Sequence, residues 1–239
     1  MTELLYQTDS YLREFDATVQ AVEGGAVALD RTAFYPGGGG QPCDLGALTA
    51  GGRTWPVTRV QKAGPVVWHT VEGEPPAAGT ALTGQLDWGR RYDFMRLHTA
   101  LHILCGVIWR DYGALVTGGN IEPGRARMDF EFERMQADLV HEIEARINAE
   151  VAAARPVSVR ILPREQAFQI PDLIRTKINL LPEGIQQVRT VAIEGLDLQA
   201  DGGTHVANTR EVGPIRIVDY MSKGKINKRL IISLEPRNP

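Results

Sequence analysis

Two histidines four residues apart, His98 and His102, constrain this chain more than any other feature. The run over 96–104 reads as helix, and residues i and i+4 of a helix lie on one face, so both imidazoles point the same way. That is half of a metal site. A second pair of plausible ligands, Asp201 and His205, follows about a hundred residues later around a Gly-Gly spacer typical of a tight loop. If these residues bind one metal, the fold must bring two distant segments together.

Other interpretations of the histidine pair are available. A histidine on an apolar helix is often a satisfied core residue, and a four-residue spacing also arises by chance. The spacing resembles the H-E-x-x-H pattern of zinc proteases, but Thr99 stands where that pattern has its glutamate base. The sequence shows no Ser/His/Asp arrangement and no G-x-S-x-G elbow. A metal held by three of the four candidates, with one position open for water, indicates hydrolysis of an activated acyl group.

Composition adds bounds on the class of protein. With 239 residues, 43% hydrophobic and 23% charged, the chain is typical of a globular protein of one large or two modest domains. The net charge of −3 gives no global signature of nucleic-acid binding. Residues 209–239, however, carry seven basic and three acidic side chains, a net +4. This tail indicates either a polyanionic partner or a solvated strand edge guarded by lysines.

Targeting signals are not recognisable in the sequence. The first residues have no basic and apolar regions of a signal peptide, and no apolar run approaches the roughly 20 residues that span a bilayer. Two cysteines, Cys43 and Cys105, do not make a disulfide framework. We therefore expect a cytoplasmic protein that does not act at a membrane.

Strand and turn signals dominate the first part of the chain, and helical periodicity appears later. Short, regularly spaced runs from residue 14 to about 87, with glycines and prolines between them, predict a small β-barrel or sandwich. Further on we expect helices over 88–111 and 137–154, a short helix and loop over 163–181, and strands over 116–121, 126–132, 157–161, 188–193, 213–220 and 229–234. The fold class is therefore α+β. A β-rich, barrel-like domain over 1–88 precedes an α+β domain over 89–239, whose helices pack on a largely antiparallel sheet.

Four consecutive glycines, at positions 37–40, interrupt the β-rich part. Such a run costs backbone entropy, so it belongs either to a flexible hairpin tip or to a place where backbone must approach a ligand closely. Tyr35-Pro36 before it and Gln41-Pro42 after it stiffen the flanks, which favours a shaped loop.

Five short motifs together resemble the alanyl-tRNA editing family, which comprises the editing domain of alanyl-tRNA synthetase and its free-standing AlaX relatives. The motifs are T-x-F-Y-P-x-G-G-G-Q-P, R-x-x-H-T-x-x-H-x-L, R-x-D-F, G-G-T-H-V-x-N-T-x-E-V-G and S-K-G-K, at residues 32–42, 96–104, 127–130, 202–213 and 222–225. They occur in the family's order. The chain resembles a free-standing member that has an N-terminal barrel before the editing core.

The resemblance implies a metal-dependent, ATP-independent hydrolase that deacylates mischarged tRNA(Ala) in trans, with serine or glycine as the wrong amino acid and a metal-bound water as nucleophile. It implies one Zn²⁺ per chain, with His98, His102 and His205 as ligands. The implied partner is tRNA; no obligate protein partner is evident and the oligomeric state stays open. The resemblance places Gln41 and Thr32 in the catalytic set, with the Thr32 hydroxyl facing the seryl side chain. Asp201 joins this set on its own chemistry, as a carboxylate that can accept the proton of a metal-bound water. The substrate-binding set is Gly37, Gly38, Gly39, Gly40, Arg127, Lys223, Lys225, Lys228 and Arg229.

Asp201 departs from the family pattern, which has cysteine at this position. Zinc accepts a carboxylate oxygen as well as a thiolate. Asp201 is therefore a candidate fourth ligand or, alternatively, a base that holds the metal-bound water. Two other functions stay open: editing of another mischarged tRNA, since threonyl-tRNA synthetases carry a similar histidine pair, and RNA binding by a module whose zinc is structural. A closed structural site fills all four positions with protein ligands.

Overall fold

The computed structural model describes residues 1–133, 135–171, 173–175 and 184–235. The chain divides into two compact units, Met1–Phe94 and Met95–Pro239, and each is described by itself. The expected α+β class is confirmed: a closed antiparallel barrel is accompanied by further sheets and by helices. The domain boundary expected between residues 88 and 89 stays a prediction, because compactness alone does not show that a segment folds independently.

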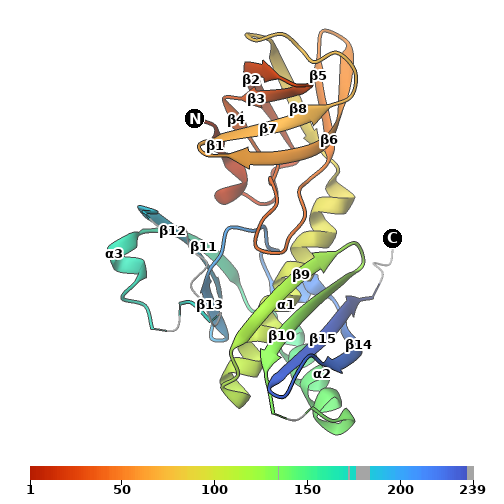
Figure 1. Ribbon diagram of the computed structural model, residues 1–239, viewed down its shortest axis with the longest axis vertical. Helices are drawn as coiled ribbons and strands as arrows, with labels where there is room; N and C mark the ends of the chain where they lie inside the picture. Colours follow the sequence, from red (N-terminus) through yellow and green to blue (C-terminus); the bar gives the residue numbers. More distant parts are fainter. Residues whose placement is uncertain (134, 172, 176–183, 236–239) are drawn as a thin grey trace. The chain divides into compact units, whose positions relative to one another are not determined.

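The N-terminal unit is built on a closed barrel with strand order β2-β3-β7-β6-β5-β8 (Figure 1). Its strands are β2 (Glu14–Glu23), β3 (Ala26–Leu29), β5 (Gly46–Ala50), β6 (Arg53–Ala63), β7 (Val66–Val71) and β8 (Ala81–Leu86). All neighbours pair antiparallel. Outside the barrel lie a short parallel pair, β1 (Glu3–Leu4) with β4 (Arg31–Thr32), and the 3-10 turn η1 (Leu5–Gln7).

The barrel interior follows from period-two alternation in its strands. In β2, Phe15, Ala17 and Val19 are buried, whereas the residues between them are exposed or half-buried. Gly84 pairs with Phe15 across β8 and β2, and a Cβ at Gly84 would lie 2.5 Å from the Phe15 ring. The glycine therefore makes room for an aromatic ring that lies over the neighbouring strand.

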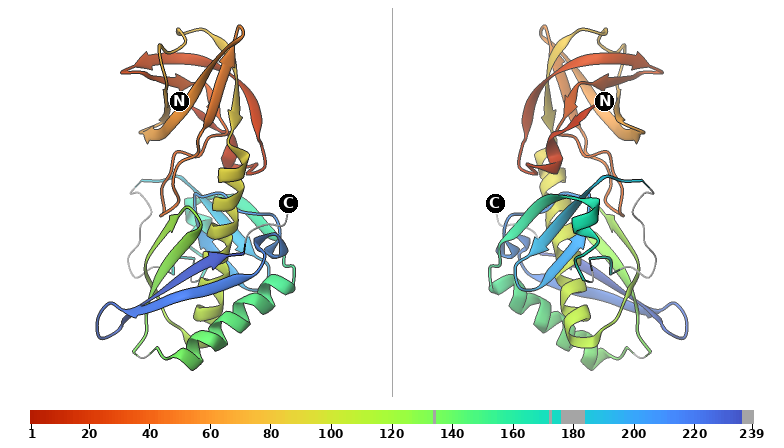
Figure 2. Two further views of the ribbon diagram at one scale, coloured as in Figure 1. Left: turned by 90° about the vertical axis from the view of Figure 1, so that its right-hand side faces the viewer. Right: turned by 90° about the vertical axis from the view of Figure 1, so that its left-hand side faces the viewer.

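In the part of the C-terminal unit that the structure describes, there are two antiparallel sheets. One has the order β14-β15-β10-β9, and the other has the order β11-β12-β13. The strands are β9 (Val116–Glu122), β10 (Arg125–Glu131), β11 (Val157–Pro163), β12 (Gln187–Ile193), β13 (Asp197–Ala200), β14 (Ile215–Ser222) and β15 (Asn227–Leu234). The helices are α2 (Ala137–Ala152), α3 (Arg164–Ala167) and the long α1 (Trp88–Tyr112), which begins in the N-terminal unit; η2 (Thr209–Val212) is a 3-10 turn. Helix α2 lies against β14 (Figure 2), where Glu144 and Asn148 accept hydrogen bonds from the backbone of Ile217 and Ile215.

Most expected elements of this unit are present, with differences at their ends. The second helix ends at Ala152, two residues before the expected end, because Ala154 adopts a left-handed conformation (φ 52°) that cannot continue a helix. Its buried face begins at Val140, and His141 is exposed as expected. Strand β13 was not predicted from the sequence, because its four residues are too few to show alternation. Residues 176–181 of the expected short helix and loop lie outside the described residues.

Candidate metal centre

The four residues singled out by spacing come together. His98 and His102 lie on α1, and Asp201 and His205 lie in the segment after β13; one ligand atom from each lies within 4.8 Å of the others. The ring centroids of His205 are 4.3 Å from those of His98 and 4.7 Å from those of His102. All three imidazoles are about 5% exposed or less. The i,i+4 pair is therefore half of a four-residue cluster, and this cluster could hold a metal ion.

Hydrogen bonds hold the loop that carries Asp201 and His205 at both of its ends. The backbone N–H of Asp201 donates to the Arg189 carbonyl, and Arg189 Nη1 donates to the Asp201 carbonyl, both at 3.0 Å. The Val206 N–H donates to Thr99 Oγ1 on α1 at 3.2 Å. Thr99 thus has a role that the sequence did not reveal: it holds the loop of His205 against the helix of the other histidines.

Arg96 attaches the next part of the same loop to α1. Its Nε and Nη2 donate to the Val212 carbonyl at 3.0 and 2.8 Å, and the side chain is 5% exposed. A Cβ at Gly213 would lie 3.1 Å from Arg96 Nη2, and Gly213 has a φ of 72°, so this position favours glycine on two counts. The arginine at the start of one motif and the Val-Gly pair at the end of another therefore form one contact.

Asp201 lies among the imidazoles. Its Oδ2 is 3.0 Å from His205 Nε2 and accepts the Gly203 N–H at 2.7 Å, and its Oδ1 is 3.5 Å from His98 Nε2. The carboxylate is thus within reach of the same space as the histidine nitrogens. Ligation by Asp201 and proton acceptance by Asp201 are both compatible with this position.

Burial and mutual charge shift the ionisation of the cluster. Desolvation lowers the pKa of His98 to about 4, although the charge of Asp201 opposes this effect. Burial, with the neighbouring His98 second, also lowers the pKa of His205 well below its usual value. Burial acts against ionisation of Asp201, but the histidines outweigh it and its pKa lies well below the usual range. The set near neutral pH is therefore a carboxylate with two neutral imidazoles, which is the ligand form that metals require.

His102 behaves differently because its other ring nitrogen is occupied. Nδ1 lies 2.9 Å from Asp197 Oδ2, and Asp197 is 4% exposed. Burial would lower the pKa of His102, but the hydrogen bond and charge of Asp197 together raise it. Asp197 was missed by the sequence reasoning, and an acidic residue within a strand before the Asp/His loop was the only local signal.

The residues fit zinc as a ligand set. Three imidazole nitrogens and a carboxylate oxygen are ligands that zinc binds, and they converge in a buried space. Harder divalent metals also accept this set, because it has no thiolate.

The glycine-rich loop of the N-terminal unit is shaped, as the flanking residues predicted. Gly37, Gly38, Gly39 and Gly40 have φ values of 83°, 138°, 56° and 89°, a region that side chains disfavour. Gly38 and Gln41 exchange backbone hydrogen bonds at 3.0 and 2.9 Å. The loop therefore has a defined backbone conformation closed by an antiparallel bridge between Gly38 and Gln41, and close approach to a ligand stays a prediction.

A buried ion pair closes the base of this loop. Asp44 and Arg91 both have fully buried side chains, and Arg91 Nε lies 3.0 and 2.9 Å from the two Asp44 oxygens. Asp44 Oδ2 also accepts the Tyr35 N–H, and the Asp44 N–H donates to the Tyr35 carbonyl. Arg91 further donates to the carbonyls of Ser10 and Ala33. Every side of this pair is satisfied within the protein.

Thr32 and Gln41 are both buried in the N-terminal unit. Thr32 Oγ1 accepts the Phe34 N–H at 3.1 Å and lies 2.8 Å from His69 Nε2. His69 Nδ1 lies 3.2 Å from the Val27 carbonyl, and burial lowers its pKa to about 4. The neutral ring then donates from Nδ1 and accepts the Thr32 hydroxyl at Nε2. Their expected position in one pocket with the metal centre stays a prediction.

The basic residues proposed to contact substrate fall into two groups. Lys223 and Lys225 are exposed on the connection between β14 and β15. Lys228 is buried, and its Nζ donates to the carbonyls of Gly224 and Lys225. The guanidinium of Arg229 pairs with Asp129 at 2.7 and 2.8 Å, and that of Arg127 contacts the same carboxylate at 3.1 Å. Arg237, also counted in the basic tail, lies outside the described residues.

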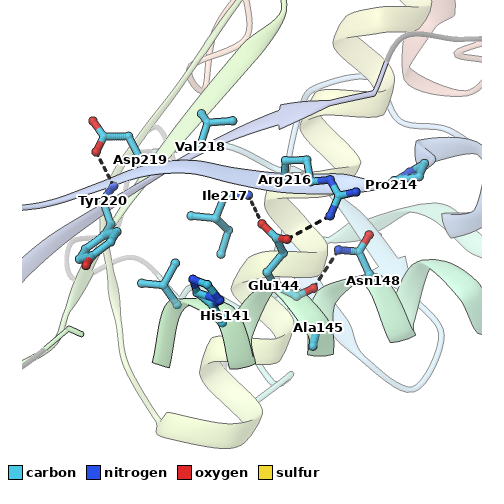
Figure 3. A pocket seen from close by; sticks show the side chains of 11 residues that line it. His141, Glu144, Ala145, Asn148, Pro214, Arg216, Ile217, Val218, Asp219 and Tyr220 are labelled. Atoms are coloured by element: carbon cyan, nitrogen blue, oxygen red, sulfur yellow. Dashed lines mark hydrogen bonds and ion pairs between the residues drawn. The ribbon is translucent and has the colours of Figure 1, made fainter. Parts of the chain in front are cut away.

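A cavity of ≈ 550 Å³ lies elsewhere in the C-terminal unit, between α2 and β14 (Figure 3). Its lining includes His141, Glu144, Arg216 and Tyr220 but none of the clustered metal ligands. Glu144 accepts hydrogen bonds from Arg216 and from the Ile217 backbone. This cavity is therefore not part of the candidate metal centre.

Among the described residues, no helix combines the length and apolar character needed to cross a membrane.

Known protein families match segments in both units of the chain. Residues 7–90 match the family described as tRNA synthetases class II (A), and residues 188–231 match the threonyl and alanyl tRNA synthetase second additional domain. The chain is 40% identical to the alanine–tRNA ligase of Thermococcus kodakarensis over 91% of its own length but only 24% of the ligase.

The matches to shorter proteins cover whole chains. The chain is 39% identical to the alanyl-tRNA editing protein AlaX-M of Saccharolobus solfataricus, over 99% of this chain and 100% of that protein. It is 38% identical to AlaX-M of Methanosarcina barkeri, over 98% and 99%. The resemblance predicted from the five motifs is thereby confirmed, and the chain belongs to the AlaX-M family of alanyl-tRNA editing proteins.

Proposed function

We propose that this chain is an aminoacyl-tRNA hydrolase that edits mischarged tRNA(Ala), removing serine or glycine from its 3′ end. Membership in the alanyl-tRNA editing family supports the reaction class and the tRNA partner. The single observation that carries the chemistry is the buried cluster of three imidazoles and one carboxylate. Hydrolysis of the ester needs an activated water and a group that accepts its proton, and this cluster offers residues for both.

Each residue of the cluster has a role in this proposal. When bound, zinc would act as a Lewis acid and let a water molecule ionise near neutral pH. His98 and His205 would hold it through the Nε2 atoms that face Asp201, and His102 through the nitrogen that Asp197 leaves available. Asp201 Oδ1 would orient the attacking water and accept its proton. The water oxygen would bond to the carbonyl carbon of the ester, the bond from that carbon to the ribose oxygen would break, and the ribose oxygen would take up the proton that Asp201 accepted. The products are a free amino acid and uncharged tRNA.

A second candidate function is RNA binding with a purely structural metal. The observation that favours it is the position of Asp201, which is close enough to the histidine nitrogens to act as a fourth ligand. Four protein ligands would leave no open position for water. Editing of a tRNA other than tRNA(Ala) is a third candidate, and it differs from the first only in substrate.

The deciding experiment is hydrolysis of Ser-tRNA(Ala) by purified protein, with and without a chelator, with zinc measured in the same preparation. We expect about one zinc per chain, loss of hydrolysis on chelation, and recovery when zinc is added back. His98→Ala should lose both metal and activity. His141→Ala is the matched control, because this histidine is exposed on α2 and outside the cluster, and it should retain both.

The outcomes separate the candidates. A metal-free, folded and active preparation would exclude the metal-dependent mechanism. Stoichiometric zinc with tRNA binding but no deacylation would favour the structural site. Hydrolysis of another mischarged tRNA in preference to Ser-tRNA(Ala) and Gly-tRNA(Ala) would retain the mechanism and correct the substrate.

A further inference from the structure

We propose that Asp197 is a positioning residue of the metal centre, which holds His102 so that its Nε2 faces the other ligands. The inference rests on the proposed function only in requiring that the cluster binds a metal. It concerns a residue that lies outside the four-residue cluster and would not touch the metal itself.

The contact between Asp197 and His102 sets the direction of the ring. Asp197 begins β13 and its side chain is fully buried, and its Oδ2 lies 2.9 Å from His102 Nδ1. A carboxylate oxygen accepts, so Nδ1 carries a hydrogen whenever the imidazole binds a metal through its other nitrogen. The lone pair is then on Nε2, the atom that remains for a metal. A carboxylate behind a ligating imidazole also strengthens the imidazole as a donor.

Asp197 is itself held from two sides. Gln199 Nε2 donates to its Oδ2 at 2.8 Å, and Arg175 Nη1 lies 3.0 Å from its Oδ1. Gln199 lies two residues along the same strand, and Arg175 comes from a different part of the chain. The carboxylate therefore cannot rotate freely, and its charge is balanced in a buried place where an unpaired charge would be costly. A residue that only filled space would not need this support.

Gly106 gives an independent indication that the approach of Asp197 matters. It follows His102 by four residues and lies inside α1, where glycine is unfavourable relative to alanine. A Cβ at Gly106 would lie 2.8 Å from Leu196 Cγ, 3.1 Å from the Leu196 carbonyl and 3.2 Å from Asp197 Cβ. The missing side chain at position 106 is therefore what allows the segment bearing Asp197 to lie against the turn of α1 next to His102.

The hydrogen bonds at Nδ1 of His205 and at Nδ1 of His102 differ in strength. His205 Nδ1 faces the neutral hydroxyl of Thr99 at 3.2 Å, whereas His102 Nδ1 faces a carboxylate at 2.9 Å. Hydrogen bonds to a charged acceptor are stronger than those between neutral groups. Loss of Asp197 should therefore affect metal binding more than loss of the Thr99 hydroxyl.

The test is zinc affinity of the full chain, measured by competition with a chromophoric chelator, together with the visible spectrum of the Co²⁺-loaded protein. Asp197→Asn keeps the shape and removes the charge; we expect roughly 10–100-fold weaker zinc binding and an altered Co²⁺ spectrum. Thr99→Val should lower affinity less. Glu150→Gln is the matched control, because Glu150 is a buried carboxylate that pairs with Arg110 and Arg155 outside the cluster. It should leave zinc affinity and the Co²⁺ spectrum unchanged even if the protein unfolds more readily.

Gly106→Ala keeps the proposal testable if Asp197→Asn does not fold. This variant keeps the Asp197 carboxylate, but the added methyl group displaces it from α1. Zinc affinity should therefore fall although the charge is retained. Wild-type zinc affinity and an unchanged Co²⁺ spectrum in either folded variant would overturn the role of Asp197 while leaving the metal centre intact. A wild-type protein that binds no zinc would instead overturn the metal centre and this inference together.

Discussion

Two buried polar clusters of this chain differ in how their groups are partnered. The Asp44–Arg91 pair in the N-terminal unit is fully buried, and each of its groups has partners of opposite charge or opposite hydrogen-bonding type. The cluster of His98, His102, Asp201 and His205 is nearly as buried, but it directs three imidazoles and one carboxylate toward a common space. Burial there drives the pKa of His98 down to about 4 and that of His205 well below its usual value.

A structural cluster and a candidate site differ in how their groups are satisfied. A buried ion pair with complete hydrogen bonding satisfies itself, and removing one partner leaves an uncompensated charge. A set of imidazole nitrogens that converge on one carboxylate offers several electron-pair donors to a cation, and a metal ion would be held by them together. Strongly shifted pKa values at several converging groups are typical of functional sites. Variants in the two clusters should therefore fail in different assays.

The largest effect is expected at Asp201. If Asp201 accepts the proton of the attacking water, Asp201→Ala should retain most of the zinc and lose about 10²–10⁴-fold in deacylation of Ser-tRNA(Ala). Asp201→Cys, which restores the residue usual in the family, should also bind metal. Zinc content and deacylation are measured on the same preparation. Loss of zinc and unfolding in Asp201→Ala would instead identify a structural ligand and favour the RNA-binding function.

Removing Arg91 should affect stability and leave the metal centre unchanged. Arg91→Met leaves Asp44 buried without its partner, so the free energy of unfolding should fall by about 3–5 kcal/mol, as measured by denaturant titration. Replacing both residues, as Arg91→Met with Asp44→Leu, should recover part of this loss because no charge remains buried. Zinc content should stay at the wild-type level in both. A variant that loses zinc but keeps its stability would contradict the contrast between the clusters.

Thr32 combines a structural contact with an expected role in specificity. Thr32→Val removes the hydroxyl that contacts His69 and the Phe34 N–H, so it should lower the free energy of unfolding by about 1–3 kcal/mol. If the same hydroxyl receives the seryl side chain, hydrolysis of Ser-tRNA(Ala) should fall by a factor of about 10–100, whereas that of Gly-tRNA(Ala) largely survives. Thr32→Ser, which keeps the hydroxyl, is the control. Equal loss on both substrates would show that Thr32 does not discriminate them.

The smallest effect is expected at the exposed lysines. Replacing Lys223 and Lys225 by alanine should weaken tRNA binding and reduce the slope of log affinity against log salt by about 2, because two phosphate contacts are lost. Lys228→Met should mainly destabilise the β14–β15 connection, since the Lys228 ammonium donates to backbone carbonyls there. Fluorescence anisotropy across a salt series measures the tRNA affinity and its salt slope. An unchanged slope in the double variant would mean that these lysines guard a solvated strand edge.

Local patterns in the sequence predicted a large part of this protein. The spacing of His98 and His102 determined a shared helix face, because helical geometry depends only on near neighbours. Alternation and turn residues predicted the barrel strands for the same reason, and four adjacent glycines with stiff flanks indicated the shaped loop. The motif resemblance added the family and the expected substrate, which no pattern of spacing contains.

Tertiary structure decided which distant groups meet and which charges are free. Asp197 reaches His102 across 95 residues of sequence, and Arg96 reaches Val212 across 116. Neither pairing could be read from the neighbours of either residue. Lys228 and Lys225 look equivalent in the basic tail, yet only Lys225 is exposed, because the side chain of Lys228 turns back onto the backbone of its own hairpin. Sequence determines which groups are present in each segment, but burial and partners depend on packing between segments.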